Sequence, residues 1–144
     1  MSHGFVRRAN GELISFDRPG SISTSVSSPS SINAKGTITG SYQDANNRTH
    51  GFVRRADGTI VSFDPPGSLG TTPRIINDAG AITGKYLADN GRLFGFVRDP
   101  HGSFTSFDPG LNTSPTSIND EGAITGIRSG APSGFVRSPE GTIT

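Results

Sequence analysis

The tetrapeptide Gly-Phe-Val-Arg occurs four times in this chain, beginning at residues 4, 51, 95 and 134. The copies are 47, 44 and 39 residues apart, and self-similarity at a period of about 20–50 residues is the signature of a repeat architecture. In such proteins each unit is one small supersecondary structure that buries its apolar face against its neighbours. The repeat therefore constrains the fold more than any single segment does.

Each unit contains short apolar segments rich in Phe, Ile and Val, which favour strands, and no segment has helical periodicity. Turn sequences separate these segments, and their Gly residues supply the positive φ of tight hairpins. The turns in and after the second copy are Asp57-Gly58, Asn77-Asp78-Ala79-Gly80 and Asp89-Asn90-Gly91. We therefore predict four strands joined by three hairpins, with one strand ending at Ile76 and the others over 81–86, 94–98 and 103–108.

The Pro- and Gly-rich stretches after Asp64 and Asp108 are predicted to be crossovers between units, because Pro cannot continue a central ladder. Four antiparallel strands in about 40–45 residues are typical of a β-propeller blade. We therefore predict an all-β protein in which residues 1–144 form a single repeat domain. It comprises a half-unit at 4–17 and units at about 31–64, 75–108 and 117–144.

This division gives fourteen strands, or about three and a half blades, and the last unit is clipped after Thr144. Propellers typically need four to eight blades to close, and open sheet edges pair with other chains. We therefore expect identical chains to complete the ring as a homodimer, with six blades favoured over seven. A fragment of a longer repeat protein and a designed chain stay open as alternatives.

The apolar repeats predict the core. Phe52 and Phe96 are expected to pack between blades. Gly40, Gly84 and Gly126 fall inside strand patterns, where Gly is destabilising, so we expect a bulge or a closely approaching backbone beside each of them.

Composition excludes several functional classes. The net charge of +1 gives no electrostatic basis for binding nucleic acid or an anionic membrane. The sequence contains no Cys, no apolar run long enough to span a membrane and no N-terminal signal peptide. No cofactor is expected.

The combined motif resembles a known family. His50-Gly-Phe-Val-Arg54, Phe63-Asp-Pro-Pro-Gly67 and Ile76-Asn-Asp-Ala-Gly-Ala-Ile-Thr-Gly84 are similar to the HAF family of bacterial extracellular repeats. Gly51 and Gly95 stand where that family usually has Ala, and Arg54 and Arg98 where an aromatic residue is common. The resemblance implies an exported, propeller-like protein, extracellular or at the cell surface, and implies no catalytic residues.

Repeated polar residues are the candidates for a repeated ligand site: Arg54, Arg98, Asp64, Asp108, Tyr42 and Tyr86. A set of Arg and Asp side chains repeated in every blade could line one end of a propeller. We favour the alternative that these charges are solvent-facing strand ends and make hairpin hydrogen bonds.

Two further sets of residues are candidate metal ligands. His3 and His50 precede Gly-Phe-Val-Arg, but Phe94 and Ser133 take that place in the other copies, which argues against a metal or catalytic role. Asn33, Asn77 and Asn119, with Asp78 and Asp120, could offer oxygen ligands to Ca²⁺. We favour hydrogen bonds from these side chains to their own turns, so no metal site is predicted.

Three functions follow in order of preference. The first is a non-enzymatic propeller module acting as an oligomeric scaffold or binding surface. The second is a lectin with sugar sites between blades, although the chain has no Trp and only Tyr42 and Tyr86 besides Phe to stack on a sugar. A hydrolase comes last, because no nucleophile, phosphate-binding or zinc motif is present.

Overall fold

The computed structural model describes residues 2–25 and 31–144. This part of the chain forms thirteen strands and no helix, which confirms the all-β prediction. No helix that could cross a membrane therefore occurs in the described ranges. The strands are β1 (Gly4–Arg7), β2 (Leu13–Phe16), β3 (Ser23–Ser25), β4 (Ile38–Gln43), β5 (Thr49–Arg54), β6 (Ile60–Phe63), β7 (Ser68–Ile76), β8 (Ile82–Ala88), β9 (Leu93–Arg98), β10 (Phe104–Phe107), β11 (Ser114–Ile118), β12 (Ile124–Ile127) and β13 (Gly134–Arg137).

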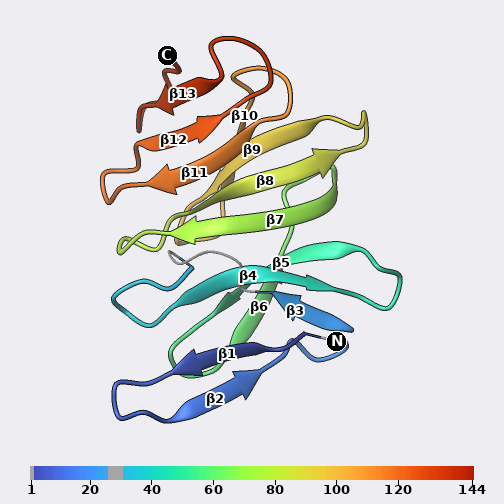
Figure 1. The fold of residues 1–144 in the computed structure, drawn as a ribbon, viewed down its shortest axis with the longest axis vertical. Helices are drawn as coiled ribbons and strands as arrows, with labels where there is room; N and C mark the ends of the chain where they lie inside the picture. The colour runs from blue at the N-terminus through green and yellow to red at the C-terminus, as the bar shows by residue number, and fades with distance from the viewer. Residues whose placement is uncertain (1, 26–30) are drawn as a thin grey trace.

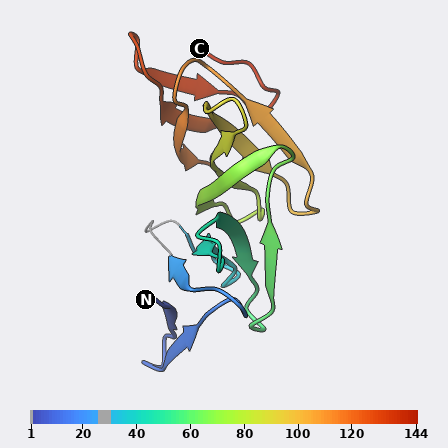
Figure 2. The same ribbon diagram turned by 90° about the vertical axis from the view of Figure 1, so that its right-hand side faces the viewer.

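The strands form four antiparallel meander sheets that follow one another along the long axis of the molecule (Figures 1 and 2). They are β1-β2, β3-β4-β5-β6, β7-β8-β9-β10 and β11-β12-β13, each in sequence order. In Figure 1 the N-terminal hairpin lies at one end of this series and β13 at the other. The order of strands is that of propeller blades, but the sheets of the described residues close no ring, so the propeller itself stays a prediction.

The predicted hairpins are present, and their glycines explain them. Gly58 and Gly80 have φ values of 93° and 92°, in the left-handed region that favours Gly. The backbone N–H of Gly58 donates to the carbonyl of Arg55, and that of Gly80 to the carbonyl of Asn77. The turn sequences thus fix where each strand reverses.

The hydrophobic core lies between successive sheets, as three separate clusters. Each cluster contains an aromatic pair in edge-to-face geometry, with one ring from the outer strand of one sheet and one from the Gly-Phe-Val-Arg strand of the next. The ring centroids are 5.9–6.1 Å apart in Phe16–Phe52, Phe63–Phe96 and Phe107–Phe135. Phe52 and Phe96 have no exposed surface, which confirms that they pack between sheets.

The glycines inside the strands are explained by close contacts, as predicted. A Cβ atom on Gly84 would lie 2.7 Å from the Cα of Pro73 and closer still to the carbonyl oxygen of Thr72. The register between β7 and β8 shifts at Pro73/Ile75, and this bulge brings the backbone against Gly84. Gly40 and Gly126 meet the carbonyl oxygens of Ser25 and Ser114 in the same way.

The stretches after Asp64 and Asp108 connect successive sheets, as predicted, but the first crossover is shorter than expected. Strand β7 already begins at Ser68, so only the residues after Phe63 and before Ser68 connect it to β6. The variable stretch predicted to cross over is mostly strand, including Pro73. Proline is tolerated there because β7 is an edge strand and Pro73 lies at a bulge, where no ladder N–H is required.

The strand count also differs by one from the prediction of fourteen. Arg137 and Ile143 form an isolated bridge where the last predicted strand would lie. A single bridge is too short to be counted as a strand, so the last sheet has three.

Candidate functional site

Three of the four repeated arginines lie between sheets, whereas Arg7 in the first sheet is exposed. The guanidinium carbon of Arg54 is 4.8 Å from the centre of the Phe16 ring, and that of Arg98 is 5.1 Å from the Phe63 ring. Arg137 lies in the same way over Phe107, at 5.3 Å. Each arginine therefore makes a cation–π contact with the outer strand of the preceding sheet.

The expectation that these arginines face solvent is wrong for Arg54 and Arg137, which are each only 8% exposed. The expected hairpin hydrogen bonds are confirmed, because each of the two donates to the carbonyl of the next residue. The aliphatic part of the side chain covers apolar surface, and the guanidinium follows it into the space between the sheets. One terminal nitrogen of Arg54 donates to the carbonyl of Arg55 at 3.3 Å. The Nε of Arg54 is buried and has no hydrogen-bond partner among the described residues.

The repeated aspartates connect one sheet to the start of the next. Asp64 follows β6 and accepts a hydrogen bond from the hydroxyl of Thr71 in β7. Asp108 follows β10 and accepts one from Thr113, just before β11, at 3.2 Å. Both threonines are fully buried, so we call this repeated pair the Thr–Asp contact.

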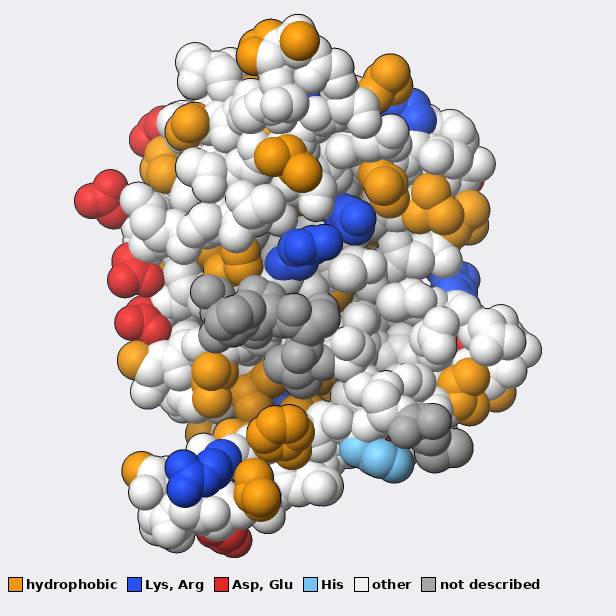
Figure 3. Space-filling model, in the orientation of Figure 1, with side chains coloured by type: hydrophobic (Ala, Val, Ile, Leu, Met, Phe, Trp, Pro, Cys, Tyr) orange, Lys and Arg blue, Asp and Glu red, His pale blue; other side chains and the backbone are white. Residues whose placement is uncertain are grey.

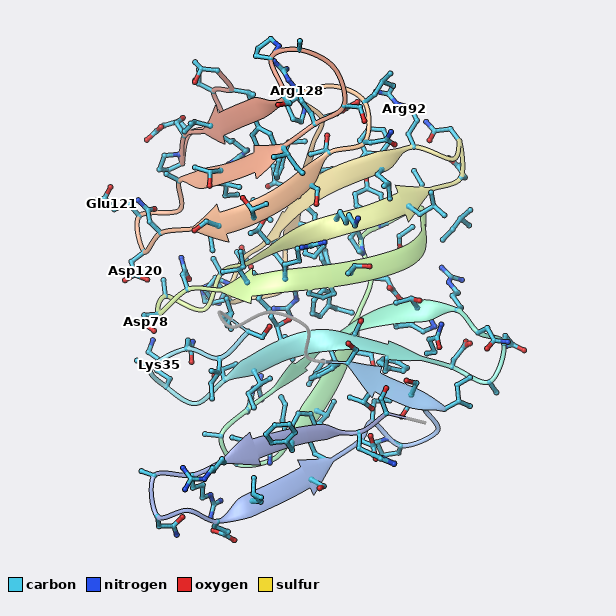
Figure 4. All side chains as sticks on the ribbon, viewed as in Figure 1. Lys35, Asp78, Arg92, Asp120, Glu121 and Arg128 are labelled. Atoms are coloured by element: carbon cyan, nitrogen blue, oxygen red, sulfur yellow. The ribbon has the colours of Figure 1, made fainter. Side chains whose placement is uncertain are left out.

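The second oxygen of each aspartate faces a basic side chain. Asp17 and Asp64 lie 2.6 Å from Nδ1 of His3 and His50. In the next unit Phe94 replaces the histidine, and Arg92, labelled in Figure 4, makes an ion pair with Asp108 instead. The hydrogen bond with His3, and then that with Thr24, lowers the pKa of Asp17.

Sequence reasoning missed the partners of these aspartates. Thr71 and Thr113 lie in the variable stretches predicted to be crossovers, and Arg92 does not align with the histidines it replaces. The signal that could have identified the threonines is their spacing of five to seven residues after the aspartate.

The arrangement around Asp64 does not have the geometry of a hydrolytic triad. In such a triad the histidine lies between the hydroxyl and the carboxylate. Here the carboxylate lies in the middle, and the two ring nitrogens of His50 face Asp64 and Asp44 at 2.6 and 3.3 Å. Neither nitrogen is left to accept the proton of Thr71, so the cluster stabilises the sheet junction without activating a nucleophile.

The two tyrosines are buried, with exposures of 6% for Tyr42 and 7% for Tyr86. Tyr42 stacks on His50 and Tyr86 on Phe94, with ring centroids 5.1 and 5.7 Å apart. Their rings are therefore already covered by neighbours and offer no open platform for a sugar.

The structure does not bring the predicted site residues together in one place. Arg54 ends β5, whereas Asp64 directly follows Phe63, which pairs with Gly51 in the first half of β5. Three residues of strand, or about 10 Å, separate these two positions. The arginines thus lie along one end of the strands, and the aspartates and tyrosines lie along the other.

The asparagine side chains form a ladder between hairpins that sequence reasoning did not predict. Nδ2 of Asn33 donates to the carbonyl of Asn77 at 3.1 Å, and Nδ2 of Asn77 to that of Asn119 at 2.8 Å. Alongside, the backbone N–H of Ala34 donates to Asp78, and that of Asp78 to Asp120. Figure 4 shows Lys35, Asp78 and Asp120 on hairpins that follow one another along a single edge.

The side-chain oxygen of each asparagine confirms the favoured interpretation for the asparagines, whereas Asp78 and Asp120 accept from the neighbouring hairpin instead of their own turns. Oδ1 of Asn33, Asn77 and Asn119 accepts backbone N–H groups of its own turn. No group of three or more His, Asp or Glu side chains placed to hold a metal ion occurs in residues 2–25 and 31–144. These side chains thus stabilise turns and connect sheets.

Comparison with known proteins adds no relative: no protein-family model, curated protein or solved structure matches this chain.

Proposed function

We propose that this chain is a non-enzymatic repeat module that assembles with a second copy into a closed β-propeller and serves as a scaffold or binding surface. The observation that carries the proposal is the direction of the contacts between sheets. The aromatic pair, the Arg–Phe contact and the Asn ladder each run from one sheet to the next with the same residue types in the same order. Head-to-tail contacts of this kind can continue between chains and close into a ring.

The first sheet presents one half of this contact without its partner. Phe5 is 64% exposed, although its equivalents Phe52 and Phe96 are fully buried. Arg7 is exposed as well, whereas Arg54 is buried. Figure 3 shows hydrophobic side chains on the surface of the β1–β2 hairpin, at the lower end of the view.

The last sheet exposes an apolar residue that is covered at the other junctions. Val136 is 49% exposed, whereas the equivalent Val53 and Val97 pack against the clusters between sheets. Burying the exposed parts of Phe5 and Val136 in one interface would stabilise a dimer by about 2 and about 1 kcal/mol respectively. A second copy of the chain supplies both complementary faces at once.

The resemblance to HAF-type extracellular repeats is consistent with this proposal, because a scaffold needs no catalytic residues. We extend the proposal to a location outside the cell, where such an assembly would present its surface to other molecules.

Mass in solution tests the assembly. We expect light scattering after size exclusion to give about twice the monomer mass of 15.0 kDa. Phe5→Ser should shift the mass to that of the monomer, and Leu111→Ser, at a residue that is 59% exposed and lies between β10 and β11, should not. A folded monomer at all concentrations, or an open-ended assembly, would contradict the proposal.

A further inference from the structure

Two cavities occupy the same place between successive sheets. The larger, about 290 Å³, lies between the β3–β6 and β7–β10 sheets, and the smaller, about 130 Å³, between the β1–β2 and β3–β6 sheets. Their walls match position by position through the repeat: Val6 with Val53, Arg8 with Arg55, Ile14 with Val61, Gly36 with Gly80, Arg54 with Arg98 and Ala56 with Pro100.

Each cavity combines two arginines with an aliphatic wall. One arginine ends the Gly-Phe-Val-Arg motif of the sheet that comes later in the chain, and the other directly follows that motif in the earlier sheet. In the larger cavity these are Arg98 and Arg55, and Lys35 is a third basic residue in the wall. Val53, Val61 and Ile82 form apolar parts of the same wall. Within the part of the chain that the structure describes, no carboxylate lines either cavity.

The two arginines that end the motif have unused hydrogen-bonding capacity, whereas Arg8 in the smaller cavity already forms an ion pair with Glu12 at 2.9 Å. The Nε atoms of Arg54 and Arg98 are buried without a partner, and neither arginine forms an ion pair with any of the described residues. Burial lowers the pKa of Arg98, and the positive charge of Arg55 lowers it further, against the opposing effect of Asp99. A buried cation without a paired anion is costly, and a bound anion would remove that cost.

The third junction, between the β7–β10 and β11–β13 sheets, provides an internal comparison. The residues equivalent to Arg55 and Val61 are Asp99 and Thr105 there, while Arg137 takes the place of Arg98. A carboxylate of the chain itself thus stands where the other two junctions have a second arginine.

We propose that each of the two cavities binds a small organic acid, with its carboxylate between the two arginines and its compact apolar part against the valine and isoleucine side chains. A guanidinium presents paired donors in a plane that match a carboxylate. The aliphatic wall favours an organic acid over a fully hydrated inorganic anion such as phosphate, because only the organic acid buries apolar surface there. The inference concerns ligand binding alone and does not depend on ring closure.

The test uses 3-methylbutanoate as the probe and backbone amide NMR shifts as the readout. We expect saturable shifts at Gly80 for the larger cavity and at Gly36 for the smaller. Arg55→Ala should weaken binding at Gly80 at least tenfold and leave Gly36 unchanged, and Arg8→Ala should do the reverse. Both residues are exposed, so neither variant should unfold the chain.

Lys85→Ala is the matched control, because it removes one positive charge from β8 at a residue that lines neither cavity. It should bind the probe as the parent chain does. The proposal is overturned if no saturation appears at about 10 mM probe, ten times a dissociation constant of about 1 mM. It is also overturned if the neutral 3-methylbutanamide or inorganic phosphate binds as tightly, or if Arg55→Ala behaves like Lys85→Ala. Solution mass, measured on the same samples, reports on assembly separately.

Discussion

Replacing Gly84 with Ala tests whether the bulged edge strand and the adjacent sheet are packed as closely as the structure indicates. The added methyl group would lie 2.7 Å from the Cα of Pro73 and 3.0 Å from Cε1 of Phe96. The Phe96 ring is fully buried, and the obstacle on the other side is backbone, so neither can move aside freely. The substitution therefore combines an enlarged side chain with a neighbourhood that has no room to relax.

The expected cost follows from these contacts. Overpacking a close-packed core typically costs about 1–3 kcal/mol, and a backbone obstacle places Gly84→Ala near the upper end. Ala restricts the unfolded chain more than Gly does, which offsets about 0.5–1 kcal/mol. We expect a net loss of about 2 kcal/mol in the free energy of unfolding.

Gly134→Ala is the matched control. Gly134 begins β13, its φ is not positive, and no atom of the described residues lies within 4 Å of the position that the new methyl group would take. The same chemical change should be neutral there or slightly stabilising. Urea unfolding of both variants, followed by circular dichroism, gives the two free energies. Equal values for Gly84→Ala and Gly134→Ala would refute the close packing between β7 and β8.

Three further outcomes are expected from urea unfolding. Asn77→Ala removes the donor to Asn119 and the acceptor for Ala81, so it should lower the free energy of unfolding by about 2 kcal/mol. Asn90→Ala loses only one hydrogen bond within its own turn and should cost less than half as much. Thr71→Val keeps the buried shape but leaves the Asp64 carboxylate without its hydroxyl donor, and should cost about 1–2 kcal/mol; an unchanged midpoint would remove the Thr–Asp contact as a stabilising feature. Backbone N–H groups, chiefly that of Ser103, lower the pKa of Asp99. Its contribution to stability is therefore complete above its ordinary value near 3.8 and is lost as the pH falls through the lower folded pKa. The urea midpoint should therefore fall as the pH is lowered below that value, and a flat profile would contradict the assignment.

The repeat predicts much of the fold because local chemistry decides where strands reverse. Gly58 and Gly80 have the positive φ that their turn sequences require, and the apolar pattern around Phe52 and Phe96 correctly identifies both rings as buried. These features depend on residues close together in sequence or on the alternation of faces along a strand. They can be deduced without knowing how the sheets stack.

The candidate site is harder to predict because its residues acquire partners from the neighbouring sheet. Nothing in the sequence near Arg54 indicates that its guanidinium covers Phe16, or that Arg8 lies across the same cavity. Charge repeated in every unit suggests solvent exposure, but the gap between two stacked sheets is narrow enough to bury a long side chain.

The sequence by itself thus determined the all-β character, the hairpin positions and the aromatic core, since turn propensity and side-chain periodicity are local properties. Only the tertiary structure decided which residues meet across the sheets: threonine with aspartate, asparagine with the next hairpin, and pairs of arginines around two apolar cavities. Those contacts depend on the offset of one sheet against the next, and no local pattern in the chain encodes that offset.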